Sequence, residues 1–332
     1  MAGTIIITGA NGSLATPAVQ LLLSKYPDYN LLLTVRNQEA IKNILAFIPQ
    51  SQADKVSVRQ LDLADLSSVH DFATTVAEEI KTGKLPPLAS IVCNAYYWNL
   101  RAKGELTGDG YEKTFQVNHI AHAALILRLL GCFSPESSGR IVLFSSDAHW
   151  PGKNGLEKYP PAIPDKLETL VKPAAQTPAD PMGRGFQQYA NSKLAIVMWM
   201  YALNRYLERD PALKHVTAIA VNPGNLADSR ALRVNTPAFF TFLSYFIIRP
   251  FLFLLRRFAD PTMRTVREAA VDIVEFATNA SSPNERGYFT LSKKDVSSPD
   301  SLNEEKQQAL WRKTLEWSRI TKENTALQAG FD

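Results

Sequence analysis

Short apolar segments alternate with longer amphipathic stretches along most of the chain, and this alternation restricts the possible folds more than any other feature. The apolar segments, such as TIII and IVLF, have no polar face, so strands made from them must be buried on both sides. Helices between them provide that cover, which predicts an α/β fold with a doubly wound parallel β-sheet. Strands are expected at 4–8, 30–36, 55–63, 90–95, 139–146, 215–221 and 287–291, and helices at 15–25, 38–48, 67–81, 111–130 and 187–208.

Composition restricts the class of protein. A chain of 332 residues, 45% hydrophobic, can bury one large core, so we expect a single domain over residues 1–332. The net charge is only +4 and no run of Lys and Arg occurs, which argues against nucleic acid as a partner. The two cysteines, Cys93 and Cys132, lie in apolar segments, which is typical of free thiols in the cytoplasm, and no spacing predicts a metal site.

A glycine-rich turn follows the first expected strand, in the sequence TGANGSLA at residues 8–15. Glycine lets the backbone turn sharply and approach a pyrophosphate, and the N-terminus of the following helix offers free amides. A tight turn between strand and helix would explain the glycines equally well, but the position after the first strand favours a dinucleotide site. The expected binding residues are Gly9, Asn11, Gly12, Ser13 and Leu14.

Two further strand ends bear on the choice of nucleotide. Sites that prefer NAD usually carry an acidic residue after the second strand, whereas this chain has Arg36, which favours NADP(H) by pairing with a 2′-phosphate. Stacking of Arg36 on adenine is the alternative. Asp62 and Leu63 follow the third strand and are expected beside the adenine, although Asp62 could simply cap a helix.

Tyr189 and Lys193, in the sequence YANSK, are four residues apart and therefore share one face of the expected helix. An ammonium beside a phenol favours the phenolate, so we expect the pair to lower the pKa of Tyr189 toward the range in which it transfers protons. By itself the pair could equally be a solvated helical face.

The chain resembles the short-chain dehydrogenase/reductase family over about residues 4–291, because it carries seven motifs of that family in the family's order. The resemblance implies a Rossmann-type fold in the ordinary single-domain branch, similar to carbonyl reductases and retinol dehydrogenases. The motifs are TGANGSLA, Asp62, Asn94 with Ala95, Asn118, Ser145 with Ser146, Tyr189 with Lys193, and Asn222 with Pro223 and Gly224.

The resemblance also implies roles for individual residues. Tyr189 would protonate the substrate oxygen, Lys193 would lower the pKa of Tyr189 and bind the nicotinamide ribose, and Ser146 would hydrogen-bond the substrate. Asn118 would hold a water that relays protons, while Ser145 is expected to be structural. Asn94, Ala95, Pro223 and Gly224 would contact the cofactor.

Two departures from the family pattern leave alternatives open. The glycine spacing TGxxGxxA resembles the extended branch, whose members often act as epimerases or dehydratases on nucleotide sugars. Tyr96 stands where the family typically has glycine, so a non-redox step such as isomerisation or cyclisation is a second alternative. The complete set of Asn118, Ser146, Tyr189 and Lys193 favours a reductase.

A proline-rich insertion separates Ser146 from Tyr189, and we expect residues 150–181 to form a rigid flap beside the site. Similar insertions occur in carbonyl reductases and in members that resemble retinol dehydrogenase, where they can block subunit pairing. A monomer or a weak homo-oligomer is therefore expected.

The expected walls of the site predict the substrate. They comprise Tyr96, Tyr97, Trp98, Trp150 and an apolar region at 225–262. An aromatic, apolar site predicts a bulky hydrophobic substrate. Together with the resemblance and Arg36, this implies NADPH-dependent reduction of a ketone or aldehyde that is polyketide-, terpenoid- or steroid-like to an alcohol.

The most apolar part of that region, residues 237–258, is interrupted by Arg249 and Pro250, so neither half is long enough to span a membrane. We expect this segment to cover the substrate site. A peripheral membrane contact with Arg256 and Arg257 facing headgroups is the open alternative to a purely cytoplasmic protein.

Overall fold

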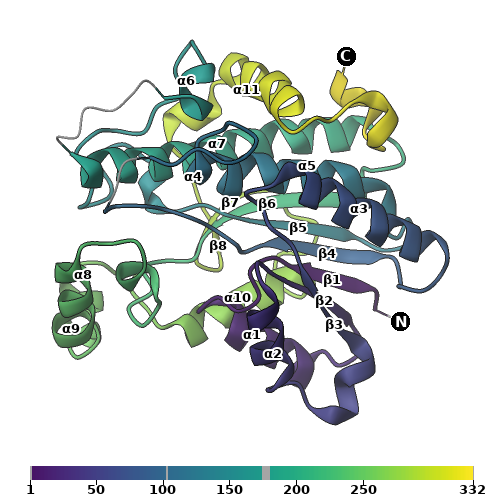
Figure 1. Cartoon of the computed structure of the whole chain (residues 1–332), viewed down its shortest axis with the longest axis horizontal. Coiled ribbons are helices and arrows are strands. Elements are labelled where there is room, and N and C mark those ends of the chain that lie inside the picture. Colours follow the sequence, from purple (N-terminus) through teal and green to yellow (C-terminus); the bar gives the residue numbers. More distant parts are fainter. Residues whose placement is uncertain (1, 102–103, 174–179, 332) are drawn as a thin grey trace.

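The computed structural model describes residues 2–101, 104–173 and 180–331, and its centre is one eight-stranded sheet in the order β3-β2-β1-β4-β5-β6-β7-β8 (Figure 1). The strands from β1 to β7 pair in parallel, and β8 is antiparallel to β7. The predicted doubly wound α/β fold is confirmed. The strands are β1 (Thr4–Ile7), β2 (Asn30–Val35), β3 (Val56–Gln60), β4 (Leu88–Cys93), β5 (Gly139–Phe144), β6 (Val216–Asn222), β7 (Gly287–Thr290) and β8 (Lys293–Lys294).

Helices cover both faces of this sheet (Figure 1). On one face lie α1 (Ala15–Lys25), α2 (Gln38–Leu45) and α10 (Val266–Ala277), and on the other lie α3 (Leu66–Lys81), α4 (Lys113–Phe115), α5 (Ala121–Leu129), α7 (Pro181–Arg209) and α11 (Glu304–Trp317). The short helices α6 (Glu168–Val171), α8 (Ala238–Leu243) and α9 (Leu252–Phe258) complete the set.

The strand β1 shows why the sheet is covered on both sides. Ile6 packs into the apolar core on the side of α3, α5 and α7, whereas Ile5 and Ile7 pack into the core on the side of α1 and α10. Successive strand residues point to opposite faces, so a continuous apolar segment is what this position requires.

Two predicted helices differ from the observed ones. The helix expected at 111–130 is interrupted by a π-helical turn at Gln116–Ile120, between α4 and α5. The helix with the YANSK sequence begins six residues earlier than expected, because Asp180 caps it by accepting a hydrogen bond from the Gly183 amide at 3.0 Å and Pro181 occupies its first turn.

The C-terminal elements complete the same sheet and helix layers. The strand β7 pairs with β6, and α10 packs on α1. The helix α11 packs on α7, where Trp311 stacks on Trp199 with ring centroids 5.6 Å apart.

The described part of the proline-rich insertion lies along α7, the helix that carries Tyr189. The Ala162 amide donates to Asn191 at 2.9 Å, and the Gln187 side chain donates to the Pro160 carbonyl at 3.2 Å. The part of the predicted flap at 174–179 lies outside the described residues.

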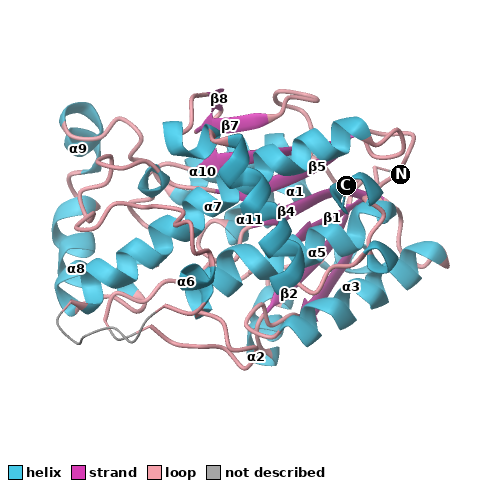
Figure 2. Cartoon of the chain, turned by 90° about the horizontal axis from the view of Figure 1, so that it is seen from above, coloured by secondary structure: helices cyan, strands magenta, loops and turns pink. Residues whose placement is uncertain are grey.

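The helices α8 and α9 lie at one end of the molecule, away from the sheet and opposite the chain termini (Figures 1 and 2). Within the described residues, no single helix has the length and apolar character to cross a membrane. In the part of the chain that the structure describes, one pair, Ala238–Ile248 and Leu252–Phe258, meets those two criteria together, and it is bent by 89°.

Candidate active site

The predicted site residues follow the carboxyl ends of the strands from β1 to β6 or lie on α7, apart from Asn118, which lies in the π-helical turn. The strand β1 lies between β2 and β4, so the strand order changes direction there, and such a point is where doubly wound sheets bind their ligands.

The glycine-rich turn between β1 and α1 has the geometry of a phosphate cradle. Gly9 has a φ of +62°, and a Cβ there would lie 3.0 Å from Ala95. The Asn94 side chain holds the turn by donating to the carbonyls of Thr8 (2.9 Å) and Gly9 (3.0 Å). The helix α1 begins without a side-chain cap and without an acidic residue in its first turn, so its N-terminus suits an anion.

A second segment, 217 residues further along the chain, contacts this turn. The backbone amide of Arg230 donates to Ser13 Oγ at 3.0 Å, and the Arg230 guanidinium donates to the Asn11 carbonyl at 2.5 Å. A cation therefore lies beside the cradle at a position that the sequence reasoning did not assign. Leu14 differs from its neighbours, because its side chain is buried in the core and only its backbone could contact a ligand.

Arg36 lies exposed immediately after β2 and makes no hydrogen bond or ion pair with any described residue. At the end of β3, Asp62 Oδ1 accepts from the Ala64 amide at 2.9 Å. The cap of α3 is Asp65, so Asp62 is not that helix cap. Leu63 is buried, which leaves its backbone as its contribution to a site.

Lys193 is buried, and its Nζ donates to the Phe144 carbonyl at 2.7 Å. Burial lowers the pKa of Lys193 to about 7 and raises the pKa of Tyr189, while the Ser146 hydroxyl opposes the latter shift. The expectation that Lys193 lowers the pKa of Tyr189 stays a prediction, because burial is the largest cause of the shift in this structure. Lys193 Nζ lies 5.4 Å from the Tyr189 ring centroid and bonds to the backbone, so desolvation dominates.

Ser146 follows β5 and caps a short 3-10 turn. Its Oγ accepts from the Ala148 amide at 3.2 Å and donates to Asp147 Oδ1 at 2.8 Å. A hydroxyl has one proton, so Asp147 determines where Ser146 can donate, a role that the sequence reasoning missed. Ser145 donates to the Lys193 carbonyl at 3.4 Å, which is a structural contact.

Asn118 lies in the π-helical turn and clamps the backbone of Tyr97. Its Oδ1 accepts from the Tyr97 amide at 2.7 Å, and its Nδ2 donates to the Tyr97 carbonyl (3.0 Å) and to Ser192 Oγ (2.9 Å). The Asn118 carbonyl lies 3.2 Å from His122 Nδ1. Because a carbonyl only accepts, Nδ1 carries the proton and His122 Nε2 accepts from Thr8 at 3.0 Å. The proton-relay role of Asn118 stays a prediction.

Aromatic rings surround Tyr189. The ring centroids of Trp98, Phe186 and Tyr96 lie 5.3, 6.1 and 6.3 Å from that of Tyr189. Leu232 packs against the same cluster of Trp98 and Phe186. Tyr96, which replaces the family's glycine, points toward the site, because Lys193 Nζ lies 5.9 Å from its ring centroid.

Other residues that were expected to form the walls of the site make their contacts elsewhere or are exposed. The Tyr97 hydroxyl donates to Glu105 at 3.3 Å, and the Trp150 ring faces Lys153. Among the described residues of α8 and α9, only Phe240 is buried. The segment 239–258 thus presents most of its large apolar side chains to the surface, which does not fit the expected cover over the site.

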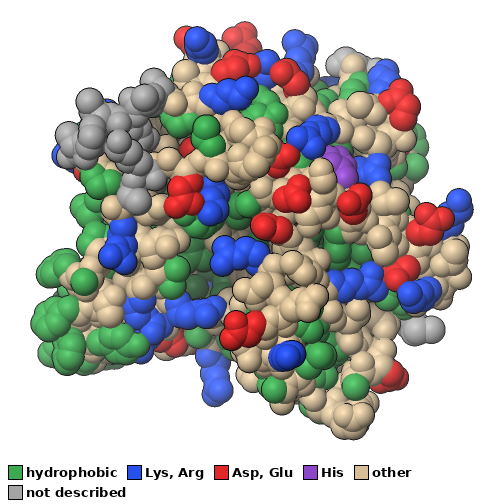
Figure 3. Space-filling view, viewed as in Figure 1, with side chains coloured by type: hydrophobic (Ala, Val, Ile, Leu, Met, Phe, Trp, Pro, Cys, Tyr) green, Lys and Arg blue, Asp and Glu red, His purple; other side chains and the backbone are tan. Residues whose placement is uncertain are grey.

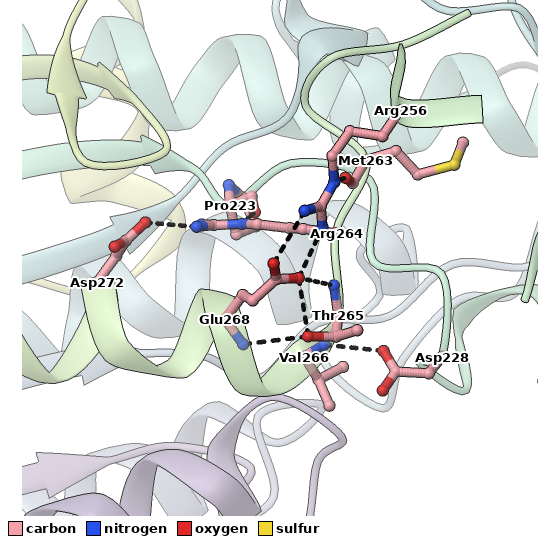
Figure 4. A network of polar contacts seen from close by, with 9 residues as sticks. All are labelled: Pro223, Asp228, Arg256, Met263, Arg264, Thr265, Val266, Glu268 and Asp272. Atoms are coloured by element: carbon pink, nitrogen blue, oxygen red, sulfur yellow. Dashed lines mark hydrogen bonds and ion pairs between the residues drawn. The ribbon is translucent and has the colours of Figure 1, made fainter. Parts of the chain in front are cut away.

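The turn after β6 is held by a buried ion pair (Figure 4). Arg264 Nε donates to the Pro223 carbonyl at 2.7 Å, and its guanidinium pairs with Asp272 at 2.5 Å. Gly224 has a φ of +82°, and a Cβ there would overlap the Thr262 carbonyl oxygen. Both contacts fix the backbone that the cofactor is expected to touch.

Gly224→Ala is expected to lower the free energy of unfolding by about 2–3 kcal/mol, since a left-handed residue costs about 1–2 kcal/mol and overpacking at least about 1. The matched control is Gly110→Ala, because Gly110 has a φ of +81° and nothing lies within 4 Å of its added Cβ. Urea unfolding measures the loss of stability in both variants. The loss in Gly110→Ala reports the backbone strain alone, and the additional loss in Gly224→Ala reports the steric overlap. Equal losses would contradict the overlap with Thr262.

Within the described residues, no group of three or more His, Cys, Asp or Glu side chains is arranged to hold a metal ion.

Comparisons with known proteins agree with this architecture. Residues 3–161 match the family model described as short chain dehydrogenase, and residues 230–327 match the AcuH dehydrogenase domain. The chain is 28% identical over 367 residues to the short-chain dehydrogenase iccH of Talaromyces variabilis, covering 98% of each. It is 47% identical over 94 residues to the dehydrogenase acuH of Aspergillus aculeatus, which is 28% of this chain and 95% of that protein. A Burkholderia cenocepacia short chain dehydrogenase solved with NADP superposes with a TM-score of 0.57 and 18% identity, over 87% of this chain and 97% of that one.

Proposed function

Because this chain belongs to the short-chain dehydrogenase/reductase family and is an oxidoreductase of that type, we propose that it reduces a bulky, hydrophobic ketone or aldehyde with NADPH. The observation that carries the proposal is the convergence of Ser146 and Lys193 on Tyr189, within a cluster of aromatic rings. The predicted family is confirmed by the matching models and relatives.

Tyr189 carries the proton that reduction of a carbonyl requires. A carbonyl oxygen that is being reduced must receive a proton, and the raised pKa of Tyr189 keeps its phenol protonated near pH 7. Lys193, with a pKa of about 7, holds a proton that it can give up easily. Lys193 Nζ lies 5.4 Å from the Tyr189 ring centroid, and we propose that it helps to reprotonate Tyr189 after each turnover.

The cradle fits a nicotinamide dinucleotide. The uncapped N-terminus of α1 and the guanidinium of Arg230 would hold the pyrophosphate, while Asp62 would accept from the adenine. When bound, the cofactor supplies the hydride. Arg36, exposed and without a described partner, would pair with a 2′-phosphate, which supports NADPH over NADH.

The environment of Tyr189 supports an apolar substrate. Trp98, Phe186 and Leu232 lie in one cluster with Tyr189, so a carbonyl that reaches its hydroxyl would do so among apolar side chains. Tyr96, 45% exposed, stands at the edge of this cluster and offers a further ring to a substrate. Such surroundings favour polyketide-, terpenoid- or steroid-like carbonyls over small polar ones.

The direct test is NADPH oxidation with a panel of carbonyl compounds graded by size and polarity. We expect kcat/KM to rise with apolar surface, by roughly tenfold for each 1.4 kcal/mol of added burial. Faster turnover of small polar ketones would overturn the substrate class. NADPH that binds but is never oxidised by any carbonyl would instead support a non-redox step.

Arg36→Asp is expected to weaken NADPH binding about 10- to 100-fold while NADH changes little, because a charge-assisted hydrogen bond contributes about 1.5–3 kcal/mol. The control is Arg312→Asp on the exposed face of α11, which changes the net charge equally. Dissociation constants for both cofactors, measured by fluorescence titration, check the result. Equal losses for NADPH and NADH would contradict the pairing of Arg36 with a phosphate.

A further inference from the structure

The surface of α8 and α9 carries an apolar patch that is unusual for a folded protein. Phe253 and Phe258 are 78% and 79% exposed. Most of the large apolar side chains that are exposed in the described part of the chain lie on or beside these helices, and they form the hydrophobic area at the lower left of Figure 3. The apolar patch comprises Phe239, Phe242, Tyr245, Phe246, Ile247, Phe251, Phe253, Leu254 and Phe258.

The outward direction of this patch is fixed by polar contacts on the inner side of α9. Arg256 makes a bidentate pair with Glu268 at the start of α10, at 2.9 and 2.7 Å, and donates to the Met263 carbonyl (Figure 4). The pair lowers the pKa of Glu268 to about 2. Leu254 and Phe258 are four residues apart and share the opposite face of α9. The helix therefore turns Arg256 to the protein and Leu254 and Phe258 outward.

The patch is bordered by positive charge that is only partly neutralised, because Arg256 is the one arginine of this region that pairs with a carboxylate among the described residues. Between Asp228 and Asp260 the sequence has five arginines and no Asp or Glu. Arg233 donates to the Tyr245 hydroxyl at 2.7 Å, and Arg249 donates to the Asp228 backbone carbonyl at 2.9 Å. These acceptors are neutral, so the arginines keep their charge, as does the exposed Arg257 beside the Phe258 ring.

We propose that α8 and α9 dock the protein on the surface of an anionic lipid bilayer, with the apolar patch in the acyl region and the arginines at the headgroups. Neither helix is long enough to cross, whereas a bent amphipathic pair can lie in the interface. A second copy of the chain is a poorer occupant. A symmetric contact would bring the same arginines together, with no acidic residue from 229–259 to balance them.

The patch is continuous with the candidate active site. The segment that leads into α8 contacts the site at three points: Arg230 bonds to Ser13, Trp98 Nε1 donates to the Val234 carbonyl at 3.3 Å, and the Leu100 amide donates to the Asn235 carbonyl at 2.8 Å. A docked protein would hold this edge of the site near the lipid, where apolar molecules concentrate. The docking itself does not depend on the catalytic assignment.

Sedimentation with vesicles tests the proposal on the full chain. Binding is expected to vesicles of phosphatidylcholine with phosphatidylserine, to weaken with added salt, and to be much weaker with phosphatidylcholine alone. Phe253→Ser with Phe258→Ser should reduce the partition coefficient more than about tenfold, because each Phe contributes about 1.5–3 kcal/mol when buried. Arg257→Glu should reduce it several-fold on anionic vesicles only.

Matched variants outside the apolar patch serve as controls. Arg312→Glu on α11 makes the same charge change as Arg257→Glu, and Val296→Ser replaces a side chain that is 66% exposed. Both should bind as the wild type does, and thermal melts should show that all variants fold. No binding by the wild type, or equal loss in the controls, would overturn the proposal. A dimer that the Phe253 and Phe258 variants dissociate in analytical ultracentrifugation would assign the patch to a second copy instead.

Discussion

Tyr189→Phe is expected to reduce NADPH-dependent carbonyl reduction more than about 100-fold while leaving the dissociation constant of NADPH nearly unchanged, since a positioned proton donor contributes about 10²- to 10⁴-fold. The substitution removes one hydroxyl and keeps the ring, so the contacts with Trp98, Phe186 and Tyr96 remain. Single-turnover rates and fluorescence titration of NADPH measure the two quantities separately.

The control for this variant lies on the same helix. Tyr201→Phe also removes a phenol hydroxyl from α7, one that contacts Ser297 Oγ at 2.9 Å, and it should keep the wild-type rate. If reduction survives in Tyr189→Phe, the proton comes from another group, and Ser146 with Asp147 becomes the next donor to test. If both variants lose activity together, the loss reflects damage to α7 rather than a missing donor.

The fold and the location of the site could be predicted because their determinants are local in the sequence. Continuous apolar strands such as Thr4–Ile7 indicate burial on both faces, and a glycine turn after the first strand indicates the cradle. The order of motifs at strand ends then indicates the family. Each of these signals needs only a few neighbouring residues.

The parts that the sequence did not predict depend on contacts between distant segments. Arg230 reaches Ser13 across 217 residues, and no local pattern marks it as a neighbour of the glycine turn. The role of Asp147 depends on the rotamer of Ser146. The spacing of Tyr189 and Lys193 places both on one face of a helix, but only the packing around them determines that desolvation controls both pKa values.

The same limitation explains why the exposure of residues 237–258 could not be predicted. Composition alone indicates an apolar segment that must be covered by something, and a substrate site was the first expectation. The pairing of Arg256 with Glu268 orients α9 with Phe258 outward, and this orientation depends on the position of α10. A residue pattern within the segment could not have distinguished a cover over the site from an exposed apolar surface.

Folding stability is expected to fall steeply as the pH is lowered from 6.5, because two buried histidines cannot take up protons in the folded state. Burial lowers the pKa of His119 to about 3 and that of His122 to about 4, against 6.5 in the unfolded chain. Between pH 6.5 and about 4 the unfolded state binds two more protons, so the free energy of unfolding decreases as the pH decreases. At pH 5 the free energy of unfolding is expected to be about 4 kcal/mol lower than at pH 7 or above.

Other groups have defined effects in this window. The pKa values of His70 and His149 are also lowered, so both residues add to the fall in the free energy of unfolding as the pH decreases. Burial raises the pKa of Glu112, and this opposes the fall near the pKa of an ordinary glutamate. Lys193 is protonated in both states below about pH 7 and adds no slope there. Urea unfolding between pH 7 and pH 5 therefore reports mainly on the histidines.

A pair of variants at one contact isolates the contribution of His119. Its Nε2 lies 2.9 Å from Thr314 Oγ1, and its ring packs against Phe115 and Trp199. His119→Phe removes the titrating group. The slope of the free energy of unfolding against pH should therefore fall by about 1.4 kcal/mol per pH unit. Thr314→Val removes the same hydrogen bond but keeps the imidazole, so it should lower stability at every pH and leave the slope unchanged. A wild-type slope in His119→Phe would show that this histidine is not the group whose protonation is suppressed by burial.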